Sequence, residues 1–428
     1  MSRSIIKAVV GRRVWDSRGR PTVEAEVRLA GGAGGRAIAP AGASTGQNEA
    51  VERRDGGEAF GGLDVSVAVE SIAREISPAI AGMDACDQAA VDERMIGLDG
   101  TPHKSRLGAN AIVAVSMATA HAAAAEMRVP LWRYLLVDQE PRLPIPEIQI
   151  FGGGAHASGR VDIQDFMVVA VGAEDYVQAL DWTAEVYRAA GRLLSDRGAL
   201  HGIADEGGYW PTFASNEEGL ELLVAAIERA GLIPHEQMAI SLDIAASELG
   251  AGGRYRLGLE GRDMDSDGFL DMLLDWTARY PIVAVEDPVG EDDPAGFQRF
   301  TAAVGDRVAV VGDDLLVTDS RRVRDAAATK QCNALLVKPN QAGTLSEAKA
   351  ALETARAAGW TNIVSARSGE TEDVTIVHLA VGWGAQMLKV GAFARSERLA
   401  KWNEGIRIAE ALGGRGELPP RDTLPWGP

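Results

Sequence analysis

Acidic residues recur in the second half of the chain at the ends of short apolar, β-branched runs. The run AISLDIA contains Asp243, IVAVEDP contains Glu286 and VAVVGDDL contains Asp313. Buried parallel strands read as apolar runs of this kind, and in a barrel the C-terminal strand ends open into one mouth. Three carboxylates gathered there would repel one another without a cation between them. Oxygen ligands with no Cys or His beside them favour Mg²⁺ over Zn²⁺, so the pattern predicts a magnesium site.

Basic residues follow the next apolar runs in the same way. Lys338 follows the apolar run ALLV within ALLVKPN, Arg367 and Ser368 lie in NIVSARSGE, and Lys389 lies in QMLKVGA. Cations across the mouth from the carboxylates suit a small anionic substrate. The alternative interpretation is structural, because acids at strand ends also cap the helices that follow, and a lysine there can form a surface ion pair.

Bulk composition limits the classes of function. A chain of 428 residues fits two domains. Its formal net charge of −18 disfavours binding to nucleic acid or to anionic membranes. Cys86 and Cys332 are far apart and in no metal-ligand spacing, which is typical of a reducing, cytoplasmic location. The N-terminus has no long apolar segment, and the Ala-rich stretch 109–125 contains polar residues that predict a buried helix instead of a membrane span.

The chain divides near a proline-rich segment, Gln139–Glu147. Before it, SIIKAVVGRRVW, PTVEAEVRLA and RAIAP predict a small antiparallel sheet, and helical patterns follow at about 65–80, 85–96 and 110–127. After it, strands and helices alternate to the end, which predicts a parallel α/β architecture with room for eight strands. We therefore expect an α+β domain at 1–138 and an eight-stranded β/α barrel at 139–428.

Ten stretches of the sequence, all in order along the chain, resemble the enolase family. They are DSRGRPTVEAEV, GASTG, LGANAIVAVSMA, GGAHA, DEGG, SLDIAASE, EDP, GDDL, SGETED and RSERLAKWN. The DEGG and GASTG stretches point to the enolase branch of the wider superfamily. The resemblance implies an N-terminal α+β lid domain, a modified eight-stranded barrel, and a homodimer or higher homo-oligomer.

The resemblance also implies a reaction and a role for each site residue. Enolases remove a proton from the carbon next to a carboxylate and then expel hydroxide as water, with a Lys or His base and one or two Mg²⁺ ions. Two Mg²⁺ ions are expected here, the second arriving with the substrate. The implied metal ligands are Asp243, Glu286, Asp313 and Ser44. The implied catalytic residues are Lys338 as base, Glu206 as acid and Asp165 as its partner, and the implied substrate-binding residues are His156, Ala366, Arg367, Ser368 and Lys389.

Physical reasoning adds two expectations about protonation. Neighbouring cations should favour the neutral form of Lys338, as a general base requires. A close pair of carboxylates, Asp165 and Glu206, should keep one of them protonated near neutral pH.

The sequence departs from the family pattern at several positions that we expect around the pocket. Ala366 replaces a histidine that contacts the substrate, and Asp165 replaces a glutamate that is one methylene longer. Further departures are Ala41, Phe151, Gly152, Trp210, the run KPNQAG and Val390. Loss of a hydrogen bond to an anion costs about 1.5–3 kcal/mol if nothing replaces it, and the smaller side chain at 366 opens space for a bulkier group on phosphorus.

Three functional hypotheses follow. The favoured one is a diverged lyase that forms an enolpyruvate phosphorus ester, similar to carboxyphosphonoenolpyruvate synthase of phosphonate biosynthesis. The alternative is an ordinary glycolytic enolase, which acts on 2-phosphoglycerate. The third is a catalytically silent enolase fold used for binding, which the full set of acidic and basic site residues disfavours.

Overall fold

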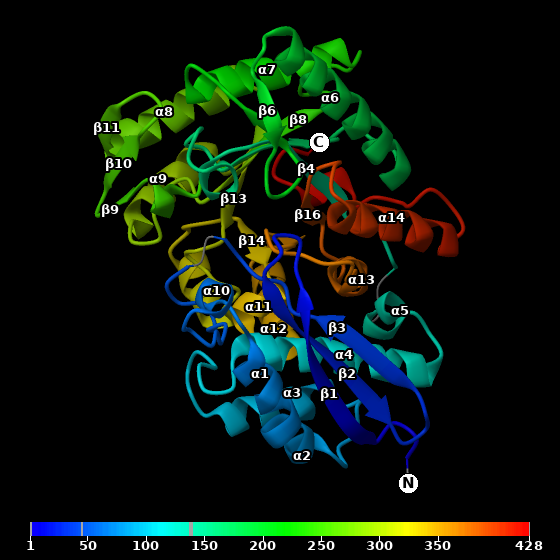
Figure 1. Cartoon of the computed structure of the whole chain (residues 1–428). Helices are drawn as coiled ribbons and strands as arrows, with labels where there is room; N and C mark the ends of the chain where they lie inside the picture. The colour runs from blue at the N-terminus through cyan, green and yellow to red at the C-terminus, as the bar shows by residue number, and fades with distance from the viewer. Residues whose placement is uncertain (1, 44–45, 137–139, 428) are drawn as a thin grey trace.

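The computed structural model describes residues 2–43, 46–136 and 140–427 of the chain. An N-terminal body, blue to cyan in Figure 1, lies below a larger body that runs from green to red. The helices α4 and α5 of the first body pack against α11 and α13 of the second. The boundary expected between residues 138 and 139 falls outside the described residues.

The N-terminal sheet is the antiparallel meander that the sequence predicts. It contains β1 (Ile6–Trp15), β2 (Pro21–Leu29) and β3 (Gly34–Ile38) in the order β1-β2-β3. Gly35 of β3 lies so close to α4 that a Cβ there would be 2.1 Å from the backbone N of Ala122. This close approach requires glycine and lets the sheet pack directly on the helix.

The helices of the N-terminal body lie close to their predicted positions. The first predicted helix is α1 (Ser66–Ser71), η2 (Ile72–Ile76) and α2 (Ser77–Ile80), a continuous run with one π-helical turn. The other two are α3 (Gln88–Asp99) and α4 (Ala109–Met127), whereas η1 (Ala59–Gly62) and α5 (Leu131–Leu135) were not predicted from the sequence. Most of α4 is buried between the sheet and the barrel. Among the described residues, no helix is both long enough and apolar enough to cross a membrane.

The second body is a closed barrel of eight strands. In chain order they are β4 (Ile145–Gly152), β5 (Asp165–Val169), β8 (Ala239–Asp243), β12 (Ile282–Glu286), β13 (Ala309–Gly312), β14 (Ala334–Val337), β15 (Thr361–Ser365) and β16 (Met387–Gly391). Neighbours pair in this order, and β16 pairs with β4 to close the ring. The fold class expected from the sequence is therefore confirmed.

One strand corrects the expectation of a wholly parallel barrel. β5 is antiparallel to both neighbours, β4 and β8. The segment between β4 and β5 contains a single 3₁₀ turn, η3 (Gly154–Ala157), and no crossover helix to carry the chain back to the starting end of the barrel. The apolar run of β5 has the same period in either direction, so the sequence pattern does not reveal its orientation.

Helices surround the barrel on the outside (Figure 1). They are α6 (Tyr176–Asp196), α7 (Asn216–Arg229), α8 (Ser266–Arg279), α9 (Pro294–Val304), α10 (Ser320–Ala328), α11 (Pro339–Ala342), α12 (Leu345–Ala357), α13 (Thr375–Trp383) and α14 (Ser396–Ala411). Asp175, Ser215, Asp265, Asp293, Asp319 and Thr344 each cap a helix through a side-chain oxygen that accepts a backbone N–H. The remaining elements are β6 (Leu200–Ile203), β7 (Tyr209–Pro211), η4 (Ala246–Glu248), β9 (Gly250–Ala251), β10 (Arg254–Leu257), β11 (Arg262–Asp265) and η5 (Arg421–Thr423).

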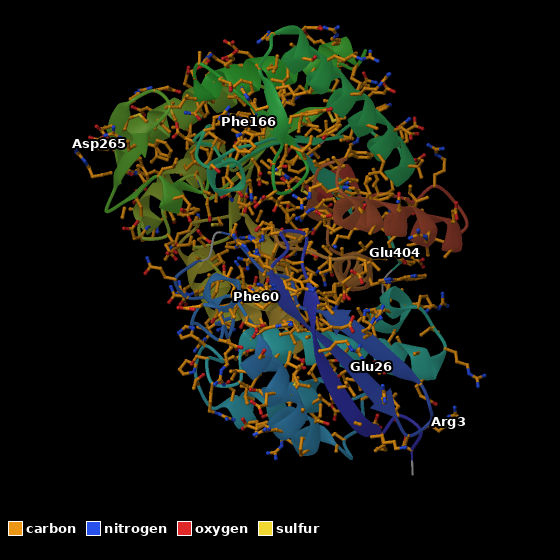
Figure 2. The ribbon with its side chains drawn as sticks, viewed as in Figure 1. Arg3, Glu26, Phe60, Phe166, Asp265 and Glu404 are labelled. Carbon is orange, nitrogen blue, oxygen red and sulfur yellow. The ribbon has the colours of Figure 1, made fainter. Side chains whose placement is uncertain are left out.

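Alternation along the barrel strands separates two cores. Outward residues such as Phe166 are buried against the helices, and Figure 2 labels Phe166 in the green part of the barrel body. Inward residues such as Ile145, Val169 and Ala239 form a separate apolar plug inside the barrel. Polar residues replace this plug at the mouth, where β5 begins and the other barrel strands end. The barrel is therefore filled by apolar side chains at one end and lined by polar ones at the other.

Candidate active site

The three predicted metal ligands lie at the ends of adjacent strands. Asp243 ends β8 and pairs in register with Glu286 at the end of β12, and Asp313 directly follows β13. All three are buried. Together with Lys338 and Lys389 they form what we call the metal side of the pocket.

Lysine side chains lie between these carboxylates. The Lys389 Nζ is 2.9 Å from Asp243 Oδ2 and 2.7 Å from Glu286 Oε2. Burial would lower the pKa of Lys389, but the surrounding carboxylates raise it well above its ordinary value. The two ammonium groups therefore occupy positions that a bound cation would compete for.

Lys338 differs from the expectation of a neutral base. Its Nζ is 2.5 Å from Asp313 Oδ2. Burial lowers the pKa of Lys338, but the contact with Asp313 outweighs burial and raises it above the ordinary value. The expectation considered only the neighbouring cations, and the closer carboxylate reverses their effect.

The metal side has the donors that a hard cation needs. Glu286 Oε1 is buried and has no hydrogen-bond partner in the described part of the chain. Burial and the charge of Asp243 raise the pKa of Glu286 well above its ordinary value, although the Lys389 ammonium opposes this shift. Gln164 Nε2 donates to Asp243 Oδ2 at 3.0 Å and Gln341 Nε2 donates to Asp313 Oδ1 at 2.8 Å, which fixes both carboxylates. An all-oxygen set with an orphaned buried oxygen fits Mg²⁺.

A second acidic layer supports Asp313. Asp287 accepts the backbone N–H of Asp313 at 3.0 Å and of Asp314 at 2.9 Å. Burial and the charge of Asp313 raise the pKa of Asp314 to about 8. Sequence reasoning did not identify Asp287 or Asp314, although both lie inside the EDP and GDDL runs.

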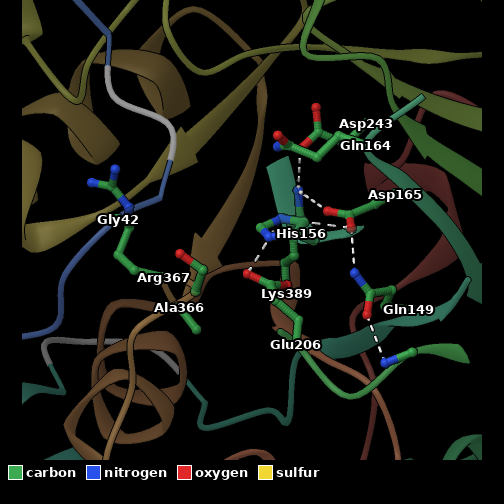
Figure 3. Close-up of polar contacts among 12 residues, drawn as sticks. Gly42, Gln149, His156, Gln164, Asp165, Glu206, Asp243, Ala366, Arg367 and Lys389 are labelled. Atoms are coloured by element: carbon green, nitrogen blue, oxygen red, sulfur yellow. Dashed lines mark hydrogen bonds and ion pairs between the residues drawn. The ribbon is translucent and has the colours of Figure 1, made fainter. Parts of the chain in front are cut away.

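Across the pocket, His156 lies between Asp165 and Glu206 (Figure 3). Its Nε2 is 3.8 Å from Asp165 Oδ1 and 3.7 Å from Glu206 Oε1. These three residues and Gln149 form the leaving-group side of the pocket. Both carboxylates thus converge on one imidazole, as the predicted carboxylate pair requires.

The pKa values of the two carboxyl groups are shifted in opposite directions. Burial raises the pKa of Asp165 above its ordinary value. Burial also acts on Glu206, but the charges of His156 and Arg398 outweigh it and lower the pKa of Glu206. One member of the pair therefore keeps a proton more readily, as expected, but that member is Asp165, whereas the resemblance assigns the acid to Glu206.

The residues implied to bind phosphorus oxygens follow β15. Arg367 is buried and contacts Glu49 through two bonds, NH1 to Oε2 at 2.9 Å and NH2 to Oε1 at 3.2 Å. Ser368 Oγ accepts a hydrogen bond from Arg18 NH1 at 3.2 Å. Figure 3 shows Arg367 and Ala366 on the far side of the pocket from Gln149.

Most of the predicted residues line one small pocket. The lining residues are Ala43, His156, Gln164, Asp165, Glu206, Asp243, Lys338, Ser365, Ala366, Arg367, Ser368 and Lys389. Glu286 and Asp313 lie behind this surface, in contact with Lys389 and Lys338. Ser44 lies outside the described residues.

The departures from the family pattern are less concentrated at the pocket than expected. Of the departures that the structure describes, Ala366 and Asp165 line it. Phe151 instead packs edge-to-face against Phe166 and Phe213, and the ring of Trp210 lies under the guanidinium of Arg160 at 5.4 Å. The reshaped part of the pocket is therefore small, and the argument for a different substrate loses support.

Besides Asp287 and Asp314, four further polar residues of the site were missed from the sequence: Glu49, Gln149, Gln164 and Gln341. Glu49, Gln164 and Gln341 lie within a few residues of quoted motifs, so proximity was an available signal. Gln149 had a weaker one, since alternation along β4 places it on the same face as Ile145, which faces the barrel interior.

Comparison with known proteins agrees with this geometry. The family models described as "Enolase, N-terminal domain" and "Enolase, C-terminal TIM barrel domain" match residues 6–135 and 140–423. The protein named Enolase 1 from Desulfitobacterium hafniense (strain Y51) is 48% identical over 422 residues, which cover 98% of this chain and 97% of that protein. The resemblance found in the sequence is confirmed, and the chain belongs to the enolase family.

Proposed function

We propose that this chain converts 2-phosphoglycerate into phosphoenolpyruvate and water, as an ordinary enolase does. Membership of the family makes the chain an enolase-superfamily carbon–oxygen lyase. The observation that carries the specific proposal is that Lys338, Glu206, Asp165 and Lys389 all line the same small pocket. A base, an acid pair and a carboxylate-binding cation are the groups that a proton abstraction followed by loss of hydroxide requires.

The metal side is proposed to bind Mg²⁺ through Asp243, Glu286 and Asp313, with Ser44 as a ligand of a second ion. Bound Mg²⁺ would supply concentrated positive charge opposite the carboxylate of the substrate. Asp313 now holds Lys338 in its charged form through the 2.5 Å contact. Lys338 accepts a proton from carbon only in its neutral form, so its ammonium group must first release a proton to solvent. Weakening the contact with Asp313 favours that release, so occupation of the metal side and activation of the base would be linked.

On the leaving-group side, the proton for the departing hydroxide comes from the Asp165–His156–Glu206 group. Asp165 is the carboxyl with the raised pKa, and His156 lies within 4 Å of both carboxylates. We propose that Lys389 binds the substrate carboxylate, and that Arg367 and Ser368 bind its phosphate. The Glu49 carboxylate fixes the guanidinium plane of Arg367 for this contact.

The second candidate is turnover of a glycerate ester with a larger phosphorus substituent, as in carboxyphosphonoenolpyruvate synthase. One observation favours it: the methyl group of Ala366 lines the pocket where the related stretch has a histidine. The 48% identity to a protein named Enolase 1 favours the ordinary reaction instead. Placement in phosphonate biosynthesis depends on this candidate.

The test measures ultraviolet absorbance from enol-ester formation on 2-phosphoglycerate with Mg²⁺, with Lys338→Ala as the blank. Strong Mg²⁺-dependent signal that vanishes in the variant supports the proposal and excludes a silent binding protein. A folded, Mg²⁺-binding protein without signal would refute it and lead to the bulkier ester.

The family resemblance supports two further proposals, a homodimer or larger homo-oligomer and a cytoplasmic location. Light scattering after size-exclusion chromatography tests the first, with a monomeric mass as the contrary result. Fractionation of source cells tests the second.

A further inference from the structure

Gln149 is buried on β4 and connects two segments that carry the acid pair. It is fully buried, on the strand face that points into the barrel. Its Nε2 donates a hydrogen bond to Asp165 Oδ1. Its Oε1 accepts the backbone N–H of Gly208 at 2.8 Å. Figure 3 shows the resulting bridge from β5 to the loop after β6.

The second end of this bridge fixes the loop that carries Glu206. Gly208 lies two residues after Glu206, and the turn is closed by Ala204 N–H to Gly208 O at 2.8 Å. A Cβ at position 208 would lie 2.4 Å from Gln149 Oε1, so glycine is needed for the approach. One carboxamide thus sets the position of Asp165 relative to Glu206, and both of these reach the same His156 Nε2.

The lengths of the Gln149 and Asp165 side chains determine whether this bridge can form. Asp165 has one methylene fewer than the glutamate that it replaces in the family pattern, so its carboxylate lies closer to β5. Gln149 approaches from the neighbouring strand β4 with two methylenes. Its reach lets it contact the shorter carboxylate while it still holds the Gly208 amide, and the summed length of the two side chains determines whether the bridge closes.

We propose that Gln149 is a positioning residue for the proton transfer to the leaving hydroxyl. It acts by holding the shorter Asp165 at the separation from Glu206 and His156 that the transfer needs. This inference rests on the proposed function, since it assigns the bridge a part in the same elimination. Gln149 has no contact with the predicted metal ligands among its hydrogen bonds in the described part of the chain.

The experiment is a double-mutant cycle that exchanges a methylene between the two side chains. Gln149→Asn shortens one side chain of the bridge by a methylene, and Asp165→Glu lengthens the other by a methylene. The double variant restores the summed length of the two side chains. We measure kcat and KM for 2-phosphoglycerate with saturating Mg²⁺ from pH 6 to 9. Gln178→Asn, at an exposed amide on α6 that accepts the backbone N–H of Glu174, is the matched control.

We expect Gln149→Asn to lower kcat at least tenfold with KM changed less than threefold, and to move the alkaline limb of the kcat profile, because the acid must be protonated. The double variant should recover most of the lost kcat. Unchanged kcat and profile in Gln149→Asn, or losses that add in the double variant, would overturn the proposal. A purely structural role would lower stability without moving the pH limb.

Thermal unfolding of the same four proteins separates this inference from the proposed function, because it needs no substrate. Recovery of Tm in the double variant shows that the two side chains contact each other as described. If that recovery occurs while the wild type fails to turn over 2-phosphoglycerate, the proposed function is refuted and the bridge is retained. Additive losses in Tm would refute the bridge itself.

Discussion

The metal side and the leaving-group side of the pocket are built from different interactions. On the metal side, full charges of opposite sign meet at 2.5–2.9 Å, as in Lys338–Asp313 and Lys389–Glu286. On the leaving-group side, the Gln149 amide donates to Asp165 and an imidazole lies 3.7–3.8 Å from both carboxylates. The lysine contact there is longer, with Lys389 Nζ 3.5 Å from Asp165 Oδ2. Removing one buried charge leaves its partner uncompensated, whereas a neutral bridge can be rebuilt with a different side-chain length. Both departures that line the pocket, Asp165 and Ala366, lie outside the metal side.

The largest expected effect is loss of Lys338, the proposed base. Lys338→Ala should lower kcat by about 10³–10⁴-fold, the upper range for a positioned general base, and should also leave the buried Asp313 without its ion pair. The absorbance assay on 2-phosphoglycerate measures it, with Lys7→Ala at an exposed position as control. Activity within tenfold of the wild type would mean that another group abstracts the proton.

The next largest effect is expected from substitution of Glu286, a proposed metal ligand. Glu286→Gln keeps the size of the side chain but removes a charge from the metal side. Even substitutions behind a metal ligand typically cost about 10–100-fold in metal affinity, so we expect the Mg²⁺ dissociation constant to rise at least tenfold. Calorimetric titration with Mg²⁺ measures it, and Glu26→Gln on the N-terminal sheet is the control. Equal affinity in wild type and variant would remove Glu286 from the ligand set.

The same contrast explains how much of the site the sequence predicts. The metal side could be predicted because charged residues at the ends of apolar runs signal both a strand end and a chemical role, as at Asp243 and Lys338. Gln149 and Glu49 were missed, since alternation along a strand or proximity to a motif indicates only where a single polar residue lies, and no charge cluster marks its partner. The reversal of β5 escaped prediction for a related reason, because alternation is the same in both directions along a strand.

The protonation of Lys338 escaped prediction because it depends on one contact distance. The sequence places several cations and carboxylates near the same mouth but gives no separations. At 2.5 Å from Asp313 the attraction exceeds the repulsion from Lys389 and Arg367. Residue types show that charges of both signs gather at one site. The direction in which the pKa of Lys338 shifts depends on the distances between these charges, which the sequence does not contain.

The pH dependence of stability tests the acidic layer without substrate. Burial and the charge of Asp313 raise the pKa of Asp314 to about 8, far above the value of about 3.9 in an unfolded chain. Between these values the folded chain keeps a proton that the unfolded chain has lost, so the free energy of unfolding falls as pH rises. From pH 6.5 to 8 the loss is about 2 kcal/mol for each such group.

One group opposes part of this slope: burial lowers the pKa of His121, so its contribution to stability rises with pH around 6.5, at the start of the window. The pKa of Asp313 lies below its ordinary value despite burial, because of Lys338 and Arg367, so it is ionised in both states throughout. We therefore expect Tm without Mg²⁺ to fall by several degrees from pH 6.5 to 8, and added Mg²⁺ to raise Tm more at pH 8, where protons compete less for the carboxylates. Scanning calorimetry measures both, and a Tm that rises over this range would contradict the buried, protonated layer.

The smallest expected effect concerns Ala366, which lies away from the charges of the metal side. If the chain acts on 2-phosphoglycerate, its existing contacts through Arg367 and Ser368 already hold the phosphate, so Ala366→His should change kcat/KM by less than about threefold, well under the 1.5–3 kcal/mol of a charged hydrogen bond. If instead the pocket is shaped for a bulkier phosphorus ester, the same substitution should raise kcat/KM for 2-phosphoglycerate by more than tenfold and abolish turnover of the larger ester. Parallel assays on both substrates, with Ala366→Ser as the size-matched control, decide between these outcomes. A small effect of Ala366→His on turnover of both substrates would also show that the pocket tolerates side-chain substitutions away from the metal side, whereas the metal side does not.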